Sequence, residues 1–193
     1  MIWKDVDASK IHRLFYPQVP IIVTAGFQGR VGAMPAIWCM PLSFKPPLVG
    51  VAIAPEHETY KIILSSDAFG INWVDFAYAK QVGELGETSA KEFREKLSGV
   101  GFTAVQGKTG QPLIYEAEAI LECRLYGRNR FGTHELMVGE VLEASASEKF
   151  GEYWDFSKYD PLLYSGTVNR KGKRWLFKSG LGKEVAVRMK LGR

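Results

Sequence analysis

The feature that most constrains this chain is an apolar but proline-rich stretch from Val31 to Pro47. A proline fixes its φ angle and lacks a backbone N–H, so the stretch cannot form a regular central strand. Its large apolar side chains, such as Trp38 and Phe44, are unusual for a solvated loop. Main chain with interrupted pairing keeps N–H and C=O groups free for a flat ligand. A proline-stiffened core loop is the alternative, and the stretch alone leaves both open.

The composition predicts one globular domain covering residues 1–193. Hydrophobic residues make up 46% of the chain and charged residues 24%, which is typical of a soluble protein. Aromatic residues reach 12%, which favours β-rich structure or the stacking of a flat ligand. No apolar run approaches the roughly 18 residues that span a bilayer, and the start lacks a signal-peptide pattern. We therefore expect a cytoplasmic protein that does not contact membranes.

Several common chemistries lack their sequence signatures. Cys39 and Cys123 do not have the spacing of a zinc site, and His12, His57 and His134 are far apart, with His12 expected on a helix surface. No Gly-x-Gly-x-x-Gly follows a strand, and residues 101–109 have one residue too many between their glycines for a phosphate loop. A Gly-x-Ser-x-Gly motif is also absent. These observations favour chemistry carried by a bound organic cofactor.

The end of the chain is strongly basic. Residues 170–193 contain nine Lys or Arg and the single Glu184, a local charge of +8, so a total of +4 leaves −4 for the rest. We interpret this basic C-terminal extension as a solvated end, or as a cover for anionic groups on a partner subunit. A nucleic-acid contact is the less favoured alternative.

The hydrophobic pattern predicts mostly β structure with minor α. Residues 114–125 alternate, which places Cys123 toward a core and Glu122 on the opposite face. A turn over 127–132 and a returning strand over 134–144 follow. Further strands are expected over 19–27, 48–54, 69–74 and 162–168, the last being the final strand. Helices are expected over 8–15, from Thr59, over 75–81, from Ser89, and briefly within 148–159. Short strands with few helices predict an antiparallel barrel.

The chain resembles the flavin reductase-like family of FMN-binding split-barrel proteins, which includes flavoredoxins and archaeal ferric reductases. The likeness rests on Ala-x-Trp-x-Met-Pro-x-Ser-Phe-x-Pro-Pro over residues 36–47, on Ile53-Ala54-Pro55, and on the segments 69–72, 132–141 and 161–164. It extends over roughly residues 15–168. The resemblance implies a split β-barrel with Greek-key antiparallel strands. It also implies a homodimer with FMN held near the dimer interface.

The resemblance places the proline-rich segment along the isoalloxazine ring. The residues implied there are Met34, Ala36, Ile37, Trp38 and Cys39. Ser43 and Thr59 match positions near the ribityl chain or the phosphate. Thr59 also begins an expected helix, where free N–H groups favour an anion, although a simple N-cap is the alternative. Lys61 would add positive charge there, or is a solvated lysine.

His134 matches a histidine on the nicotinamide side of the flavin, although a lone strand histidine is often structural. Tyr164 matches a position beside the flavin, and Asn72 contacts the cofactor or holds a loop. Gly32, Pro35 and Ile37 depart from the family pattern, which often has Asn or hydroxyl residues at these places. These departures remove side-chain contacts to the flavin and leave backbone contacts.

The resemblance implies an oxidoreductase that binds FMN, with FAD as the alternative, and takes hydride from NADH or NADPH onto flavin N5. The electrons would pass to free flavin, ferric iron, or another small-molecule or protein acceptor. A flavin-containing electron carrier without a nicotinamide site is the second hypothesis. The third is a barrel that binds nucleic acid or an anionic surface through its basic end.

Overall fold

The computed structural model describes residues 3–88, 96–169, 173–180 and 184–188. The strands are β1 (Ile21–Phe27), β2 (Arg30–Ala36), β3 (Cys39–Phe44), β4 (Pro47–Ile53), β5 (Ala68–Trp73), β6 (Ala104–Gln106), β7 (Pro112–Ile114), β8 (Ala119–Phe131), β9 (His134–Ala146), β10 (Leu162–Asn169), β11 (Lys173–Ser179) and β12 (Glu184–Arg188). The helices are η1 (Ala8–Phe15), α1 (Glu58–Ser66), η2 (Phe76–Tyr78), α2 (Ala79–Glu87) and η3 (Ser98–Val100). None of these helices is long and apolar enough to cross a lipid bilayer.

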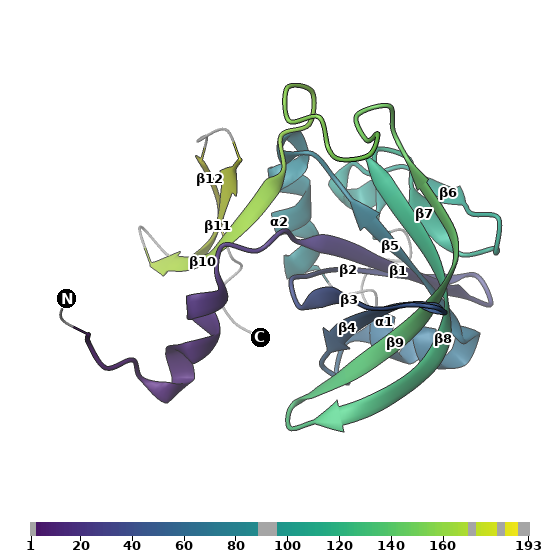
Figure 1. Ribbon diagram of the computed structural model, residues 1–193, viewed down its shortest axis with the longest axis horizontal. Helices are drawn as coiled ribbons and strands as arrows, with labels where there is room; N and C mark the ends of the chain where they lie inside the picture. The colour runs from purple at the N-terminus through teal and green to yellow at the C-terminus, as the bar shows by residue number, and fades with distance from the viewer. Residues whose placement is uncertain (1–2, 89–95, 170–172, 181–183, 189–193) are drawn as a thin grey trace.

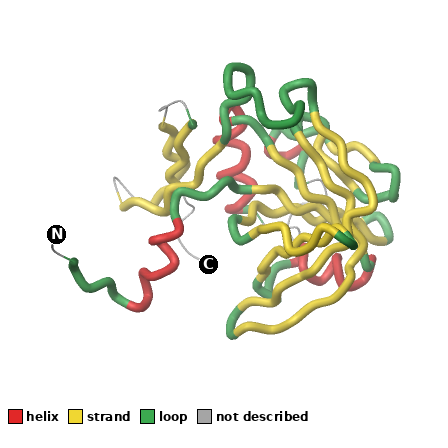
Figure 2. The backbone as a smooth tube through the Cα atoms, in the orientation of Figure 1, coloured by secondary structure: helices red, strands yellow, loops and turns green. Residues whose placement is uncertain are grey.

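The main sheet has seven antiparallel strands in the order β2-β1-β5-β8-β9-β4-β3. Strands β2 and β3 lie at its opposite edges, yet only Ile37 and Trp38 connect them. A connection this short brings the two edges together, so the sheet curls into the barrel visible in Figures 1 and 2. The predicted antiparallel β-barrel is confirmed.

Two of the four prolines of the opening stretch lie on the two edge strands, while Pro46 is in a turn and Pro47 begins β4. Pro35 is in β2 and Pro41 in β3, where a missing N–H interrupts no ladder on the outer side. The expectation that this stretch forms no central strand is confirmed. It is, however, more regular than expected, because most of it belongs to β2 or β3, and it is interrupted only at Ile37 and Trp38 and at the turn of Lys45 and Pro46.

The hairpin between β1 and β2 fixes the register of the edge. Gln28 and Gly29 both adopt left-handed φ angles, 47° and 75°, as a two-residue hairpin turn that matches the twist of the strands requires. Ile21 then pairs with Ala36 and Phe27 with Arg30. The turn predicted at residues 28–30 is confirmed.

Two apolar clusters stabilise the fold. One fills the barrel and includes Val23, Ile53 and Phe69. The other lies between the barrel, helix α2 and strands β10–β12, and includes Leu85 and Phe177. The sheet β10-β11-β12 stands beside the barrel with α2 next to it (Figure 1). Strand β10 is therefore not the last strand: in the described part of the basic end, β11 pairs with β10 and β12 pairs with β11.

Other differences from the predicted elements have local causes. Strand β8 begins at Ala119, five residues later than the start expected at residue 114, because residues 115–118 form a turn and an irregular segment after β7. It continues to Phe131, so the expected turn over 127–132 shrinks to Gly132 and Thr133, where Gly132 has a φ of 59°. Residues 148–159 form a loop instead of a short helix, with Trp154 stacked on Tyr159 at 4.3 Å between ring centroids. Helix α2 extends to Glu87, six residues beyond the expectation. The start of the helix expected from Ser89 lies outside the described residues.

A carboxylate on the face of β8 opposite Cys123 is buried. Cys123 is buried, as predicted, but Glu122 is buried too, with 2% of its surface exposed. Its carboxylate accepts hydrogen bonds from the backbone N–H groups of Lys108 (3.0 Å) and Thr109 (2.7 Å), and from the Thr109 hydroxyl. The alternation misses this because the loop that covers Glu122 is remote in sequence.

Candidate functional site

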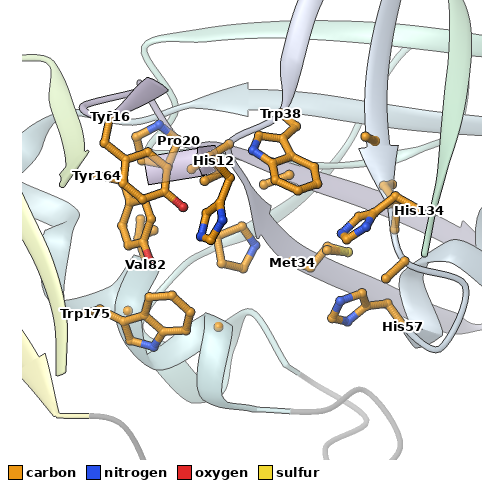
Figure 3. A pocket seen from close by; sticks show the side chains of 18 of the residues that line it. His12, Tyr16, Pro20, Met34, Trp38, His57, Val82, His134, Tyr164 and Trp175 are labelled. Atoms are coloured by element: carbon orange, nitrogen blue, oxygen red, sulfur yellow. The ribbon is translucent and has the colours of Figure 1, made fainter. Parts of the chain in front are cut away.

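A cavity of about 380 Å³ lies where β2, β4, α2, β9, β10 and β11 meet. Apart from three histidines, its lining is apolar or aromatic, and Figure 3 shows the principal side chains. The residues are His12, Tyr16, Pro20, Met34, Pro35, Ala36, Ile37, Trp38, Ala52, Ile53, Ala54, His57, Val82, Gly83, Gly86, His134, Tyr164, Trp175 and Phe177. Its volume and apolar character fall in the range of small-molecule and cofactor sites.

The floor of the cavity is the outer edge of β2. The N–H of Gly26 on β1 points away from β2, because it donates to the Gln111 side chain at 3.0 Å. Gly26 is paired with Val31, so this is a pair without hydrogen bonds between the two strands, and the N–H and C=O groups of Val31 point away from β1. Because these directions alternate along a strand, the main-chain groups of Ala33 and Pro35 also point outward from the sheet. The carbonyl of Ala33 accordingly accepts a hydrogen bond from Lys96 Nζ at 2.6 Å. Pro35 therefore presents a carbonyl, without an N–H, toward the cavity.

One side of the cavity carries two histidines and a tryptophan. Trp38 lies against His134, with ring centroids 4.6 Å apart and an interplanar angle of 53°. Nδ1 of His134 is 2.9 Å from the Thr133 hydroxyl oxygen. Burial lowers the pKa of His57, and the nearby Lys96 and His134 lower it further against the opposing effect of Glu56. A neutral imidazole is thereby favoured at position 57.

The opposite side is aromatic (Figure 3). Tyr164 is at its centre, with ring centroids 5.1 Å from Tyr16, 5.5 Å from Trp175 and 5.8 Å from Phe177. Burial raises the pKa of Tyr164, so its phenol stays neutral. His12 is half-buried at the cavity and meets Tyr16 edge-on at 5.9 Å, which corrects the expectation that it lies on a helix surface.

A positively charged group lies close to the start of α1. Lys96 is 5% exposed, and no described carboxylate lies within ion-pair distance of its ammonium group. Burial lowers its pKa to about 8. Thr59 in the first turn of α1 is buried, and a Cβ added at Gly32 on β2 would lie 3.1 Å from its hydroxyl oxygen. The free N–H groups of a helix start and a buried ammonium together suit an anion.

The structure brings most of the predicted ring-binding residues together. Those that line the cavity are Met34, Ala36, Ile37, Trp38, His134 and Tyr164. Thr59 lies behind them, next to Gly32. Six of the predicted residues therefore lie together at one cavity, and their contact with a flavin stays a prediction.

Besides Thr59, four more of the predicted cofactor residues do not line this cavity. Cys39 borders a separate groove beside Met40, and burial raises its thiol pKa to about 11. Ser43 is on β3 opposite Leu48. The side chain of Lys61 is half-exposed, and its amine donates to Glu58 at 2.7 Å.

Asn72 instead ties elements of the barrel together. Its amide nitrogen donates to the Ile22 carbonyl at 2.9 Å and to the Thr24 hydroxyl at 3.1 Å, while its oxygen accepts from the Ile114 N–H at 2.9 Å. The side chain is fully buried. This arrangement matches the loop-holding alternative for Asn72, because its polar atoms already have partners within the protein.

Sequence reasoning missed four residues at or beside the cavity. They are His12, His57, Lys96 and Trp175. His57 directly precedes α1 as its N-cap residue, a position that the sequence indicated without the neighbouring cavity. Lys96 and Trp175 reach the site only through tertiary packing, so no local pattern marks them.

The cavity can hold a flat organic cofactor, by the chemistry of its lining. The outward main chain of β2 offers hydrogen-bonding groups beside apolar walls, and the Lys96 ammonium with the start of α1 suits a phosphate. The residues present therefore fit FMN. Among the residues that the structure describes, no three His, Cys, Asp or Glu side chains are grouped as metal ligands.

Comparisons with known proteins identify relatives of this chain. An uncharacterized protein of Aeropyrum pernix is 39% identical over 171 residues, which cover 88% of this chain and 65% of the relative; this chain thus spans somewhat less than two thirds of that protein. A ferric-chelate reductase (NAD(P)H) of Archaeoglobus fulgidus is 33% identical over 167 residues, covering 86% of this chain and 95% of the relative.

A solved structure gives the same fold. The FMN-binding protein from Thermus thermophilus, with bound 1-cyclohex-2-enone, superposes with a TM-score of 0.73 at 25% identity, and the match covers 100% of this chain and 99% of that chain. The model of the flavin reductase like domain matches residues 12–172. The chain therefore belongs to the flavin reductase-like domain family.

Proposed function

We propose that this protein is an FMN-dependent oxidoreductase that takes hydride from NADH or NADPH and passes electrons to a small-molecule or protein acceptor. The observation that carries the proposal is the apolar cavity along the outward edge of β2, with the buried Lys96 ammonium beside it. The FMN-binding protein of Thermus thermophilus and the NAD(P)H-dependent ferric-chelate reductase of Archaeoglobus fulgidus support it as similar proteins.

Different residues around the cavity would bind the phosphate and the ring of FMN. Lys96 and the start of α1 would bind the phosphate, because both provide positive electrostatic potential. The Pro35 carbonyl and the main chain of Ile37 would bind the polar edge of the ring. Bound FMN would supply a ring that accepts hydride. Since hydride transfer depends on alignment, no catalytic triad is needed.

Trp38 and His134 would form the nicotinamide side of the site. Their contact at 4.6 Å fixes both rings beside the cavity, and an imidazole N–H can donate to a carboxamide oxygen. Ferric iron and free flavin are the acceptors that we propose first, since the Archaeoglobus fulgidus relative is a ferric-chelate reductase.

An absorbance spectrum and a stopped-flow experiment test this function. Protein purified with FMN should show flavin bands that bleach when it is mixed anaerobically with NADH or NADPH. Release of the flavin followed by chromatography separates FMN from FAD. Stable flavin bands that neither nucleotide bleaches would favour the electron-carrier hypothesis. A colourless protein that gains no flavin spectrum on incubation with FMN or FAD would contradict the proposal.

We also propose that the protein is a homodimer. Strand β3 is an outer edge of the sheet, and Met40, Leu42 and Phe44 on it are 52%, 40% and 95% exposed. Apolar side chains in a row on an unpaired edge are a typical protein interface. A second copy that covers this edge would remove both the apolar exposure and the unpaired main chain.

A further inference from the structure

The aromatic side of the cavity depends on a segment outside the family match. The flavin reductase like domain model ends at residue 172, whereas Trp175 and Phe177 come from β11. Strand β11 pairs with β10 so that Thr167 faces Trp175 and Tyr164 faces Phe177. This chain thus adds two aromatic side chains to the cavity from beyond the family's matched region.

Contacts from a neighbouring helix hold Trp175 in place. Its indole N–H donates to Oε1 of Glu87 on α2, with 2.5 Å between the heavy atoms. A Cβ added at Gly86, one residue earlier on α2, would lie 4.0 Å from the Trp175 ring and 3.3 Å from Pro35. Since glycine has no side chain, α2 leaves a gap between the indole and the β2 edge. The indole is therefore an oriented flat surface and not a mobile cover.

The electrostatics of this side select against charge. None of the residues that line the cavity in the described structure is Asp, Glu, Lys or Arg. Glu87 is engaged with the Trp175 N–H outside that lining, and the Tyr164 phenol is neutral. The positive charge of Arg13 acts to lower the pKa of both Tyr16 and Tyr164, but Arg13 is exposed to solvent and lies outside the lining. Moving a charged ligand from water into such surroundings is costly, whereas a neutral ring gains by stacking.

We propose that Tyr16, Tyr164 and Trp175 form a subsite for an uncharged aromatic electron acceptor of the quinone class. This inference rests on the proposed oxidoreductase function and adds an acceptor class to the ferric iron and free flavin proposed above. In the overall reaction NAD(P)H gives a hydride, water gives a proton, and the quinone becomes quinol, so two electrons and two protons enter the acceptor. The segment after residue 172 thereby supplies Trp175, one of the three side chains of this subsite.

The decisive experiment compares binding and turnover in Trp175→Ala, Trp175→Phe and the unchanged protein. The dissociation constant of 1,4-naphthoquinone is measured by calorimetry on FMN-loaded protein without NAD(P)H, and the KM for the same quinone by NAD(P)H oxidation. We expect Trp175→Ala to raise both about tenfold, and Trp175→Phe to raise them about two- to threefold, since a flat ring remains. A sulfonated naphthoquinone should bind at least tenfold more weakly than the neutral quinone.

Trp154→Ala is the matched control, because Trp154 also stacks on a tyrosine but does not line the cavity. It should leave naphthoquinone binding unchanged. If Trp175→Ala lowers the affinity for FMN and leaves quinone affinity unchanged, the aromatic side binds the flavin itself and the inference is wrong. Equal binding of the sulfonated and neutral quinones would also overturn it. Failure of NAD(P)H to bleach the flavin would contradict the proposed function instead, and the calorimetry would still test the subsite.

Discussion

The two edge strands of the barrel, β2 and β3, use proline in the same way but face different surroundings. Pro35 in β2 lies at a cavity, with the carbonyl of Ala33 on the same edge bound by Lys96. Pro41 in β3 is exposed, and the apolar side chain of Phe44 on the same strand is 95% exposed. Both edges lack a sheet partner on their outer side. One edge is covered within the chain, and the other is left open.

This difference indicates that a proline on an edge strand has a different role on β2 than on β3. A proline at an edge removes an N–H that would otherwise recruit another strand. On β2 the interrupted edge leaves carbonyls for a ligand beside a buried ammonium. On β3 it leaves an apolar surface suited to a second copy. Changes on β2 should therefore affect flavin binding, and changes on β3 should affect association.

The largest change in stability should come from substituting glycines on or beside the two edge strands. A methyl group added at Gly32 on β2 would lie 3.0 Å from Cα of Thr59, which is backbone. Added at Gly50 on β4, it would lie 2.9 Å from Cδ1 of Leu42, which is the end of a flexible side chain on β3. We expect Gly32→Ala to lower the free energy of unfolding by about 1–3 kcal/mol, and Gly50→Ala by less than about 1 kcal/mol.

Urea unfolding followed by fluorescence measures both values. Gly32→Ala should also weaken FMN binding, because the added methyl group displaces the start of α1. Equal losses for the two variants would mean that α1 moves as readily as the Leu42 side chain, and would contradict the close packing on β2.

The next effect separates two lysines near α1. Lys96→Met should weaken FMN binding by about ten- to fiftyfold, the value of one charge-assisted hydrogen bond, and should leave riboflavin binding nearly unchanged. Lys61→Met should change FMN affinity less than about twofold, because Lys61 is half-exposed and pairs with Glu58. Titration of flavin fluorescence gives each affinity. A larger effect at Lys61 than at Lys96 would assign the phosphate to the outer face of α1.

The pKa of Lys96 gives a pH test of the same group. Burial lowers it to about 8 in the folded protein, so between pH 8 and 10.5 the unfolded chain binds more protons than the folded chain. The contribution of Lys96 to stability therefore rises with pH across this window. FMN affinity should fall across the same window as the ammonium is lost, and this fall should be absent in Lys96→Met. If FMN affinity fell with pH in Lys96→Met as it does in the unsubstituted protein, Lys96 would be excluded from phosphate binding.

The exposed edge should respond through association. Phe44→Ser and Leu42→Ser together should raise the dissociation constant of the proposed dimer at least about tenfold, by analogy with aromatic anchors at interfaces. Sedimentation velocity over a range of concentrations measures the shift. The free energy of unfolding of the monomer should change little, because Phe44 is almost fully exposed. A dimer that survives both substitutions would place the interface elsewhere.

Much of the fold could be predicted because its signals are local. The prolines at 35 and 41 restricted their strands to sheet edges, and the alternation around Cys123 identified the long central strand, though not its first and last residues. The turn at Gln28 and Gly29 followed from residue type alone. In each case the physical cause lies within a few residues of its effect.

The missed features depend on contacts between remote segments. Glu122 is buried because a loop more than ten residues away folds over it. Lys96 reaches Ala33 across 63 residues, and Trp175 reaches Glu87 across 88. Likewise, Trp175 and Phe177 of β11 are surrounded in the sequence by lysines and arginines, so the segment was not recognised as a strand with an apolar face. No pattern of charge or hydropathy within one segment can report such contacts, since each partner is set by the closure of the barrel.

The smallest expected change in stability comes from replacing one proline on each edge strand. These substitutions test the difference between β2 and β3 most directly, because each adds one backbone N–H to its edge. Pro35→Ala and Pro41→Ala should each cost about 0.4–1 kcal/mol of stability through the greater freedom of the unfolded chain. On β2 the new N–H points toward the cavity, so FMN affinity should change by up to about threefold without any change in association. On β3 the new N–H completes an open edge, so self-association should increase while FMN affinity stays constant. If both variants changed the same property, the two edges would serve one surface, and the division between a ligand edge and a partner edge would be wrong.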